Sequence, residues 1–148
     1  MNQQFIKVRS LRDITIFASL ILIGAILALL PYGMGLNIAG YTLIIIGIVL
    51  ALILKSAYRE VNNPGIYYKR ELFFEPKLKN EILRTIERDP SRLSLSEEGK
   101  GLSIRLDLYY SSTSSSAFLQ LFEYVPYEYN AVSEVVECDR SKVKHIIK

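Results

Sequence analysis

The chain has 148 residues, of which half are hydrophobic and only 22% are charged. Its mean hydropathy of +0.21 is high for one soluble domain, in which roughly a quarter of the residues carry charge. The excess is local, because 31 of the 41 residues from Ile14 to Leu54 are apolar and none is charged. The composition excludes both a wholly soluble protein and a transporter with many spans. It indicates one membrane segment joined to a small globular part.

Two apolar runs, Ile14 to Leu30 and Leu36 to Leu54, follow a basic N-terminal segment, residues 1–13. A helix of the second run's length spans about 28 Å, close to the roughly 30 Å hydrocarbon core of a bilayer. Neither run has a polar face, which argues against a buried pair of soluble helices. Proline and glycines in the connector, residues 31–35, favour a turn. We therefore expect a transmembrane helical hairpin over residues 14–54.

The charges that flank the hairpin predict its orientation. The connector carries no charge, whereas cationic residues precede the first run and follow the second. By the positive-inside rule both termini are expected in the cytoplasm, at a bacterial inner membrane. These cations are also expected to contact lipid headgroups. They are Lys7, Arg9, Arg12, Lys55, Arg59, Lys69 and Arg70.

Small residues recur at helical spacing within both runs. Gly24 and Ala28 are four apart in the first, while Gly40, Gly47 and Ala51 share one face of the second. Small residues let the backbones of membrane helices approach closely. The spacing predicts helix packing within the hairpin, with homo-oligomerisation through the same faces as the alternative.

The remainder, residues 65–148, is long enough for one small core. A turn signal at residues 62–65 separates it from the membrane segment. Residues 66–74 are expected to form a strand, followed by a helix from Pro76 to Asp89. That helix places apolar side chains on one face at helical spacing. They are Leu78, Ile82, Leu83 and Ile86.

After this helix the hydrophobic period changes to two, which is typical of half-buried strands. The alternation begins at Leu93 and is strict from 102 to 109, and we expect further strands at 118–125 and 131–138. Asp139 or Ser141 can cap a short last helix. The predicted fold is a membrane helical hairpin plus a small cytoplasmic α+β domain, whose antiparallel sheet has three to five strands.

No residue pattern supports catalysis, a cofactor or a metal. The only histidine, His145, lies near the chain end, and the only cysteine, Cys138, is interpreted as a small buried hydrophobe. One cysteine and one histidine cannot build a structural zinc site. We therefore expect a protein that is not an enzyme and has no cofactor or metal.

Eight of the ten tyrosines follow the hairpin, and tyrosine is favoured at protein interfaces. We predict a partner-binding surface there, with completion of the core as the alternative for some members. Residues 96–139 carry two cations and eight anions, a net charge of −6 that disfavours nucleic acid. The basic C-terminal cluster is open to two interpretations, headgroup contact or plain solvation. The predicted partner surface comprises Tyr109, Phe122, Tyr124, Tyr127 and Tyr129.

The outline is loosely similar to small bacterial membrane proteins in which a two-span hairpin carries a pleckstrin-homology-like sheet. The early helix departs from that order, and no residue role is carried over. The leading hypothesis is a membrane-anchored, non-enzymatic interaction or regulatory module that binds a protein partner. The alternative is an oligomeric membrane effector, or a small subunit of a membrane complex, whose soluble domain senses a signal.

Overall fold

The computed structural model describes residues 5–31, 33–61 and 65–147, which divide into two compact units. One unit runs from Lys7 to Ala57 and is helical; the other comprises the residues before Lys7 and those from Tyr58 onward. The second unit is built on an antiparallel sheet. The predicted combination of two apolar helices and an antiparallel-sheet domain is therefore confirmed. The predicted turn at residues 62–65 lies, except for Gly65, outside the described residues.

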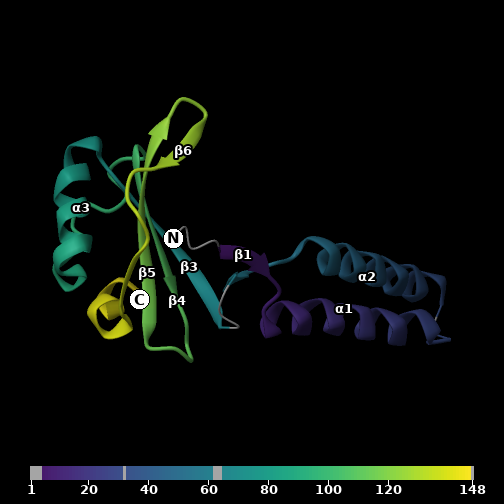
Figure 1. The fold of residues 1–148 in the computed structure, drawn as a ribbon. Helices are drawn as coiled ribbons and strands as arrows, with labels where there is room; N and C mark the ends of the chain where they lie inside the picture. Colours follow the sequence, from purple (N-terminus) through teal and green to yellow (C-terminus); the bar gives the residue numbers. More distant parts are fainter. Residues whose placement is uncertain (1–4, 32, 62–64, 148) are drawn as a thin grey trace. The chain divides into compact units, whose positions relative to one another are not determined.

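The helical unit consists of α1 (Leu11–Leu29) and α2 (Met34–Ile53), shown in Figure 1. By length and composition both helices could cross a membrane. They agree with the predicted runs to within three residues. The helix α1 begins earlier than expected because Ser10 and Asp13 form a capping box, in which each side chain bonds the backbone N–H of the other residue.

Close packing of α1 against α2 depends on three glycines. A Cβ on Gly24 would lie 2.7 Å from the carbonyl oxygen of Gly40, and one on Gly47 would lie 2.6 Å from the Ile21 side chain. A Cβ on Gly40 would overlap the backbone of Ala28. These predicted packing residues thus lie at the contact between the two helices of one chain. The fifth predicted residue, Ala51, is half-buried on α2.

The Asp13 carboxylate connects the start of α1 with the end of α2, the two ends of the helical unit that the connector does not join. Asp13 is 1% exposed and accepts hydrogen bonds from the backbone N–H groups of Ser10 and Ser56, both at 2.9 Å. The Ser56 hydroxyl donates to the same carboxylate at 2.6 Å. Arg9 donates to the Ala51 carbonyl, one of the last carbonyls of α2 that have no partner within the helix. The residues before α1 and after α2 are therefore joined by polar contacts within this unit.

The second unit contains one seven-stranded sheet in the order β1-β2-β3-β4-β5-β6, with β7 also paired to β5. The pairs from β2 to β7 are all antiparallel. Both β6 and β7 pair with β5, at its opposite ends, as Figure 1 shows. The strands are β1 (Phe5–Val8), β2 (Ala57–Glu60), β3 (Ile66–Phe74), β4 (Ile104–Tyr110), β5 (Ser116–Val125), β6 (Glu128–Ala131) and β7 (Val136–Asp139).

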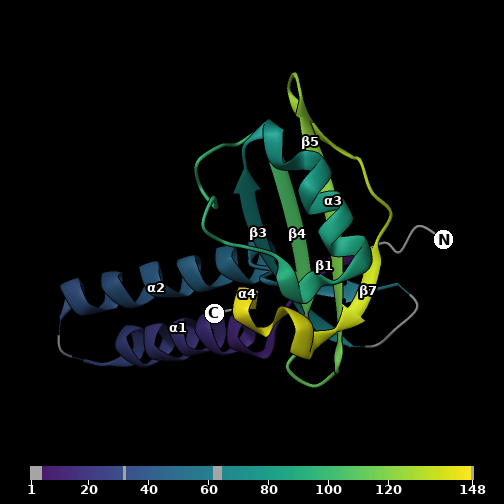
Figure 2. The ribbon, with the colours of Figure 1, turned by 90° about the vertical axis from the view of Figure 1, so that its left-hand side faces the viewer.

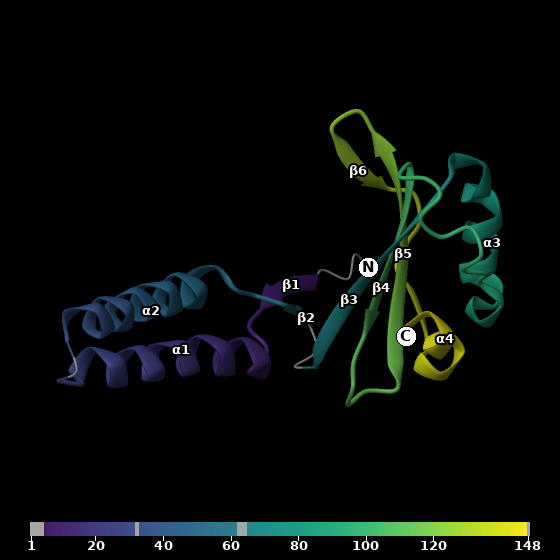
Figure 3. The same cartoon turned by 180° about the vertical axis from the view of Figure 1, so that it is seen from behind.

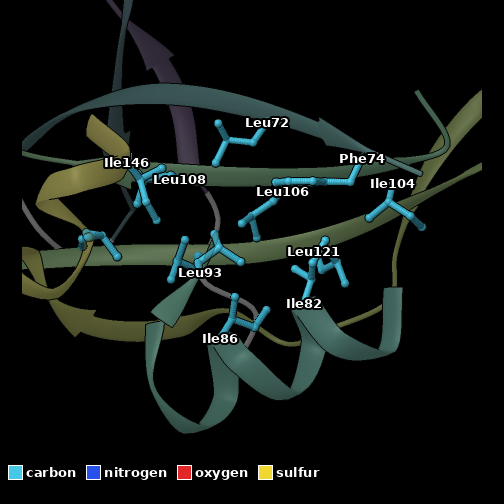
Figure 4. Packing of buried hydrophobic residues seen from close by; sticks show 13 residues of the cluster. Leu72, Phe74, Ile82, Ile86, Leu93, Ile104, Leu106, Leu108, Leu121 and Ile146 are labelled. Carbon is cyan, nitrogen blue, oxygen red and sulfur yellow. The ribbon is translucent and has the colours of Figure 1, made fainter. Parts of the chain in front are cut away.

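Helical segments cover one face of β3, β4 and β5 (Figure 2). They are η1 (Pro76–Leu78), α3 (Lys79–Arg88), η2 (Pro90–Arg92), η3 (Arg140–Val143) and α4 (Lys144–Ile147). Ile82 and Ile86, one turn apart on α3, pack over the buried leucines of the sheet (Figure 4). The register aligns Leu72, Leu106 and Leu121 across three strands, so this row of the face is apolar. The predicted helix and its apolar face are confirmed.

Three predictions within the sheet were wrong in detail. Leu93 follows η2 outside any strand, because it packs into the core from a loop. The strict alternation begins in β4 at Ile104, since Leu102 is 70% exposed. The strand expected at 131–138 is confined mainly to β7, and residues 132–135 lie outside any strand, where the Ser133 hydroxyl accepts the Leu121 N–H and interrupts the ladder. The short strands β1 and β2 had not been expected.

The glycine contacts predict opposite effects for one substitution at two positions of α2. Alanine raises helix propensity by about 1 kcal/mol over glycine. Gly35→Ala, where a Cβ meets nothing within 4 Å, should therefore leave the melting temperature in detergent unchanged or higher. Gly40→Ala should lower it, because its Cβ overlaps the Ala28 backbone. Thermal unfolding followed by circular dichroism measures both variants; equal melting temperatures would contradict the close packing.

Candidate interaction surface

The sheet face that points away from α3 carries three rows of side chains. Figure 3 shows the same strands from behind relative to Figure 1, with α3 on one side of the sheet. The register places Lys69, Tyr109 and Phe118 side by side, and then Glu71, Asp107 and Gln120. The third row is Phe73, Arg105 and Phe122. The face therefore changes from aromatic to ionic and back to aromatic along the strands.

An aromatic cluster buries the first end of this face. Phe5 stacks on Tyr109 with ring centroids 4.0 Å apart and meets Tyr67 edge-on. Tyr58 and Phe118 complete the contacts, and Tyr109 is only 9% exposed. Burial raises the pKa of the Tyr109 hydroxyl to about 12. Tyr109, a predicted member of the partner surface, is thus a core residue; its place on the strand had suggested a polar, exposed face, but β1 supplies a ring that covers it.

A buried carboxylate organises the middle of the face. Asp107 is 1% exposed and lies 2.8 Å from the Lys69 ammonium and 3.0 Å from the Arg105 guanidinium. Glu71 also pairs with Lys69, at 2.6 Å. Burial raises the pKa of Asp107, which its cations only partly offset. Burial alone would lower the pKa of Lys69, but hydrogen bonds to Asp107 and Glu71 outweigh burial and raise it. Lys69 is thus held inside an ion-pair network.

Arg105 connects this network to the β5–β6 hairpin. Its guanidinium carbon lies 4.7 Å from the centroid of the Phe122 ring and 4.4 Å from that of Tyr129, in cation–π contact with both. The Tyr129 hydroxyl donates to the Leu102 carbonyl at 2.5 Å. Tyr124 packs against Tyr129 with centroids 5.2 Å apart. The hairpin is therefore fixed to the sheet by a cation between two rings, with a third ring beside them.

The tip of the hairpin is apolar and exposed. Val125 pairs with Glu128, so Pro126 and Tyr127 form a two-residue loop. Tyr127 has a φ of +80° and a side chain that is 97% exposed. Proline followed by a residue of positive φ is the pattern of a type II turn, where glycine is favoured at the second position. Tyr124 and Val125 beside it are 50% and 42% exposed.

The charges around the tip are acidic. Glu128 is exposed, and among the described residues no cation lies within ion-pair distance of it. Glu123, at the base of the hairpin, pairs with Lys79 at 2.6 Å. We define the hairpin surface as Phe122, Tyr124, Val125, Tyr127, Glu128 and Tyr129.

The structure brings four of the five predicted surface residues together on this hairpin and places Tyr109 elsewhere. Two residues that contact the hairpin had not been predicted, Arg105 and Phe73. The ring centroids of Phe73 and Tyr129 are 6.4 Å apart. Both follow the alternating pattern of their strands, so the sequence indicates on which face of the sheet they lie. The sequence does not indicate their contact with the hairpin, because that contact depends on the strand register.

The predicted headgroup contacts divide into two groups. Lys69 is buried in the network, and Arg70 donates to the Ile146 carbonyl at 2.5 Å and lies 3.7 Å from Glu98. The side chains of these two residues are therefore engaged by contacts within the sheet domain and do not suit headgroup binding. The remaining five are exposed: Lys7, Arg9, Arg12, Lys55 and Arg59.

The residues considered for catalysis lie in ordinary surroundings. His145 contacts the Leu93 carbonyl through Nε2 at 3.0 Å. Cys138 is half-buried and packs against the main core, and burial raises the pKa of its thiol to about 11. Across residues 5–31, 33–61 and 65–147, no group of three or more His, Cys, Asp or Glu side chains could hold a metal ion. The hairpin surface offers aromatic rings, exposed apolar area and the Glu128 carboxylate.

Comparison with protein-family models, with curated proteins and with solved structures found no match in any of the three.

The network predicts a large effect for one carboxylate and a small one for its neighbour. Asp107→Asn leaves Lys69 and Arg105 without their buried anion, which should lower the free energy of unfolding by about 3 kcal/mol. The matched variant Glu71→Gln, at a side chain 41% exposed, should cost about 1 kcal/mol or less. Chemical unfolding of the full chain in detergent measures both. Similar losses for the two variants would refute a central role for Asp107.

The thiol offers a test that depends on pH. With a pKa of about 11, Cys138 should carry about a hundredfold less thiolate at neutral pH than an ordinary protein thiol of pKa about 9. Iodoacetamide should therefore label it slowly, and the rate should keep rising up to about pH 11. The same reagent on denatured chain gives the reference rate. A plateau near pH 9 in the folded protein would contradict the burial of this group.

Proposed function

We propose that the chain is a membrane-anchored, non-enzymatic module whose sheet domain binds a protein partner through the hairpin surface. The single observation that carries the proposal is Tyr127, a bulky ring held almost fully in solvent on a backbone that favours glycine. A positive φ at a non-glycine residue costs on the order of 1–2 kcal/mol. Because the Tyr127 ring is 97% exposed, packing against the described residues does not offset that cost. A contact outside the chain supplies a reason for keeping the ring there.

The hairpin surface also indicates the chemistry of the partner. Tyr124, Val125 and Tyr127 expose apolar area, and Glu128 adds a charge that forms no ion pair with the described part of the chain. Tyrosine contributes large contact area at interfaces with little loss of side-chain entropy. The partner that fits is a protein with an apolar pocket bordered by lysine or arginine. Like-charge repulsion makes an acidic partner a poor fit.

The anchor in this proposal is the helical unit, in a bacterial inner membrane with both termini in the cytoplasm. Support comes from two helices of 19 and 20 residues that are apolar enough to cross a bilayer. Exposed Arg12 and Lys55 lie next to their open ends, whereas the connector carries no charge. Cations on cytoplasmic flanks and their absence from the translocated loop are the expected asymmetry.

The alternative, an oligomeric effector or complex subunit, requires helix faces that can receive a second copy. Gly24, Gly40 and Gly47 lie against the other helix of the same chain, so these small residues give the alternative no additional support.

A pair of substitutions at Tyr127 separates binding from backbone strain. Tyr127→Gly removes both the ring and the strain, so it should abolish partner binding and raise the free energy of unfolding by about 1 kcal/mol. Tyr127→Ala removes the ring but keeps the strain, so it should abolish binding with no gain in stability. Unfolding of the full chain in detergent gives the stability. A partner bound equally well by both variants and the natural chain would overturn the proposal.

Photo-crosslinking identifies the bound partner. A benzoylphenylalanine at position 127, in cells that express the full chain, should crosslink one discrete protein. The matched position is Glu87, which is exposed on α3 and should give no such product. The product should weaken with Tyr124→Ala and with Glu128→Lys, which introduces like charges against a cationic pocket. A product insensitive to both changes would count against the hairpin surface.

A further inference from the structure

A second surface, distinct from the hairpin, is formed where the C-terminal end of α3 meets η2, η3 and α4. Three neighbouring hollows lie there, with volumes of about 200, 360 and 390 Å³. Ser141 and Lys144 line two of them, so those two are adjacent. We call this the basic surface. Its charged lining residues are Arg84, Arg88, Arg92, Arg140, Lys142, Lys144, Asp89 and Asp139.

The basic surface holds more positive than negative charge, at six cations to two anions. Both carboxylates are already engaged by backbone at turns. Asp89 accepts from the Ser91 N–H and hydroxyl, and Asp139 accepts from the Ser141 N–H at 2.7 Å. These bonds lower the pKa of both groups, so both are ionised at neutral pH. A net charge of +4 nevertheless remains, on a domain whose residues 58–148 carry fourteen cations and fourteen anions.

The cations of this surface are available to an external ligand. Arg92 has a side chain 83% exposed and pairs with Asp89 at 3.3 Å. Arg140 donates to the Ser112 carbonyl at 3.3 Å, a neutral acceptor that leaves its charge uncompensated. Arg88, Lys142 and Lys144 are exposed. Most of the positive charge therefore faces solvent.

The basic surface and the hairpin surface lie toward different ends of the sheet. The helix α4 and the β5–β6 hairpin lie toward opposite ends of β5, as both Figure 1 and Figure 3 show. The basic surface adjoins the start of β5, where β7 pairs with Ser116 to Leu119. The hairpin with Glu128 lies at the end of β5, where β6 pairs with it. An anionic plane that attracts the basic surface would leave the hairpin surface free.

We propose that the basic surface binds the headgroups of anionic phospholipids. Each of the three hollows is lined by two or three cations. Cations divided among three hollows suit a plane of many phosphates better than the capture of one phosphate at a single site. The ligand chemistry is a phosphate ester, and the source assigned is the lipid bilayer.

This inference rests on the proposed membrane anchoring, which supplies the bilayer at high effective concentration. A tethered domain meets the headgroups in an intramolecular step, so contacts too weak to recruit a free protein become populated. The residues involved differ from the cations that flank the helical unit. The basic surface would thus orient the sheet domain, whereas the helices only retain it.

Fluorescence quenching in bilayer nanodiscs tests the proposal with the full chain. A fluorophore is attached at the edge of the basic surface through Ser115→Cys, in a chain that also carries Cys138→Ala. The measurement is the quenching of its fluorescence by nitroxide groups on the lipid headgroups. Nanodiscs of phosphatidylcholine alone are compared with nanodiscs that also contain phosphatidylglycerol. Quenching should increase about twofold with the anionic lipid and return to the phosphatidylcholine level at high salt.

Charge-matched variants separate this surface from general electrostatics. Arg88→Glu with Lys142→Glu should remove the increase. Lys77→Glu with Lys100→Glu, the same charge change at exposed sites elsewhere, should retain it. Equal quenching in both lipids, or equal loss in both variants, would overturn the proposal. Loss of the increase on adding inorganic phosphate at constant ionic strength would overturn the lipid assignment in favour of the free anion.

Insertion of the full chain into the membrane is measured separately from quenching. The assay is flotation of the chain with liposomes after alkaline extraction. A chain that stays with the lipid but shows no anionic dependence contradicts the basic surface alone. A chain released by alkali contradicts the proposed anchoring, and the inference built on it fails with it. The two failures are therefore distinguishable.

Discussion

The position of the hairpin surface depends on one buried carboxylate. Asp107 lies in the middle row of the sheet face opposite α3, paired with Lys69 toward the aromatic cluster and with Arg105 toward the hairpin. Arg105 can lie between Phe122 and Tyr129 because Asp107 holds its guanidinium in place. A buried ion pair adds little stability over apolar replacements, but it fixes geometry when every partner is present. Here it connects the aromatic cluster at one end of the face with the rings of the hairpin.

The two faces of the sheet carry different side chains. Leu72, Leu106 and Leu121 form a continuous apolar row under α3, whereas the opposite face is ionic at its centre. The helix α3 packs Ile82 and Ile86 onto the first face, and this contact stabilises the core. The two proposed binding surfaces, the β5–β6 hairpin and the turns around α4, lie outside this leucine row and differ in charge.

The sequence was sufficient for features that depend on local periodicity. The strand at 66–74, the helix ending at Arg88 and the capping by Asp139 all follow from spacing and turn chemistry. Tyr109 shows where that reasoning ends. Its alternation pointed it away from the leucine core, but Phe5, more than a hundred residues earlier, covers it. Likewise the spacing of Tyr124, Tyr127 and Tyr129 predicted the cluster on the hairpin. The contact of Arg105 with that cluster could not be predicted, because it depends on the strand register.

The order of the strands explains why Phe5 can reach that position. In the sheet β1 and β2 are neighbours, yet α1 and α2 lie between them in the chain. The helical hairpin therefore occupies the place of a strand connection, and the sheet domain is completed by residues on both sides of it. Phe5 precedes the helices and Tyr58 follows them, and both pack on Tyr109. A chain begun at residue 65, the boundary that composition suggests, would lack both rings and expose the aromatic cluster. The anchor and the sheet are thus interleaved in sequence, so the proposed interaction domain extends back to the residues that precede its anchor.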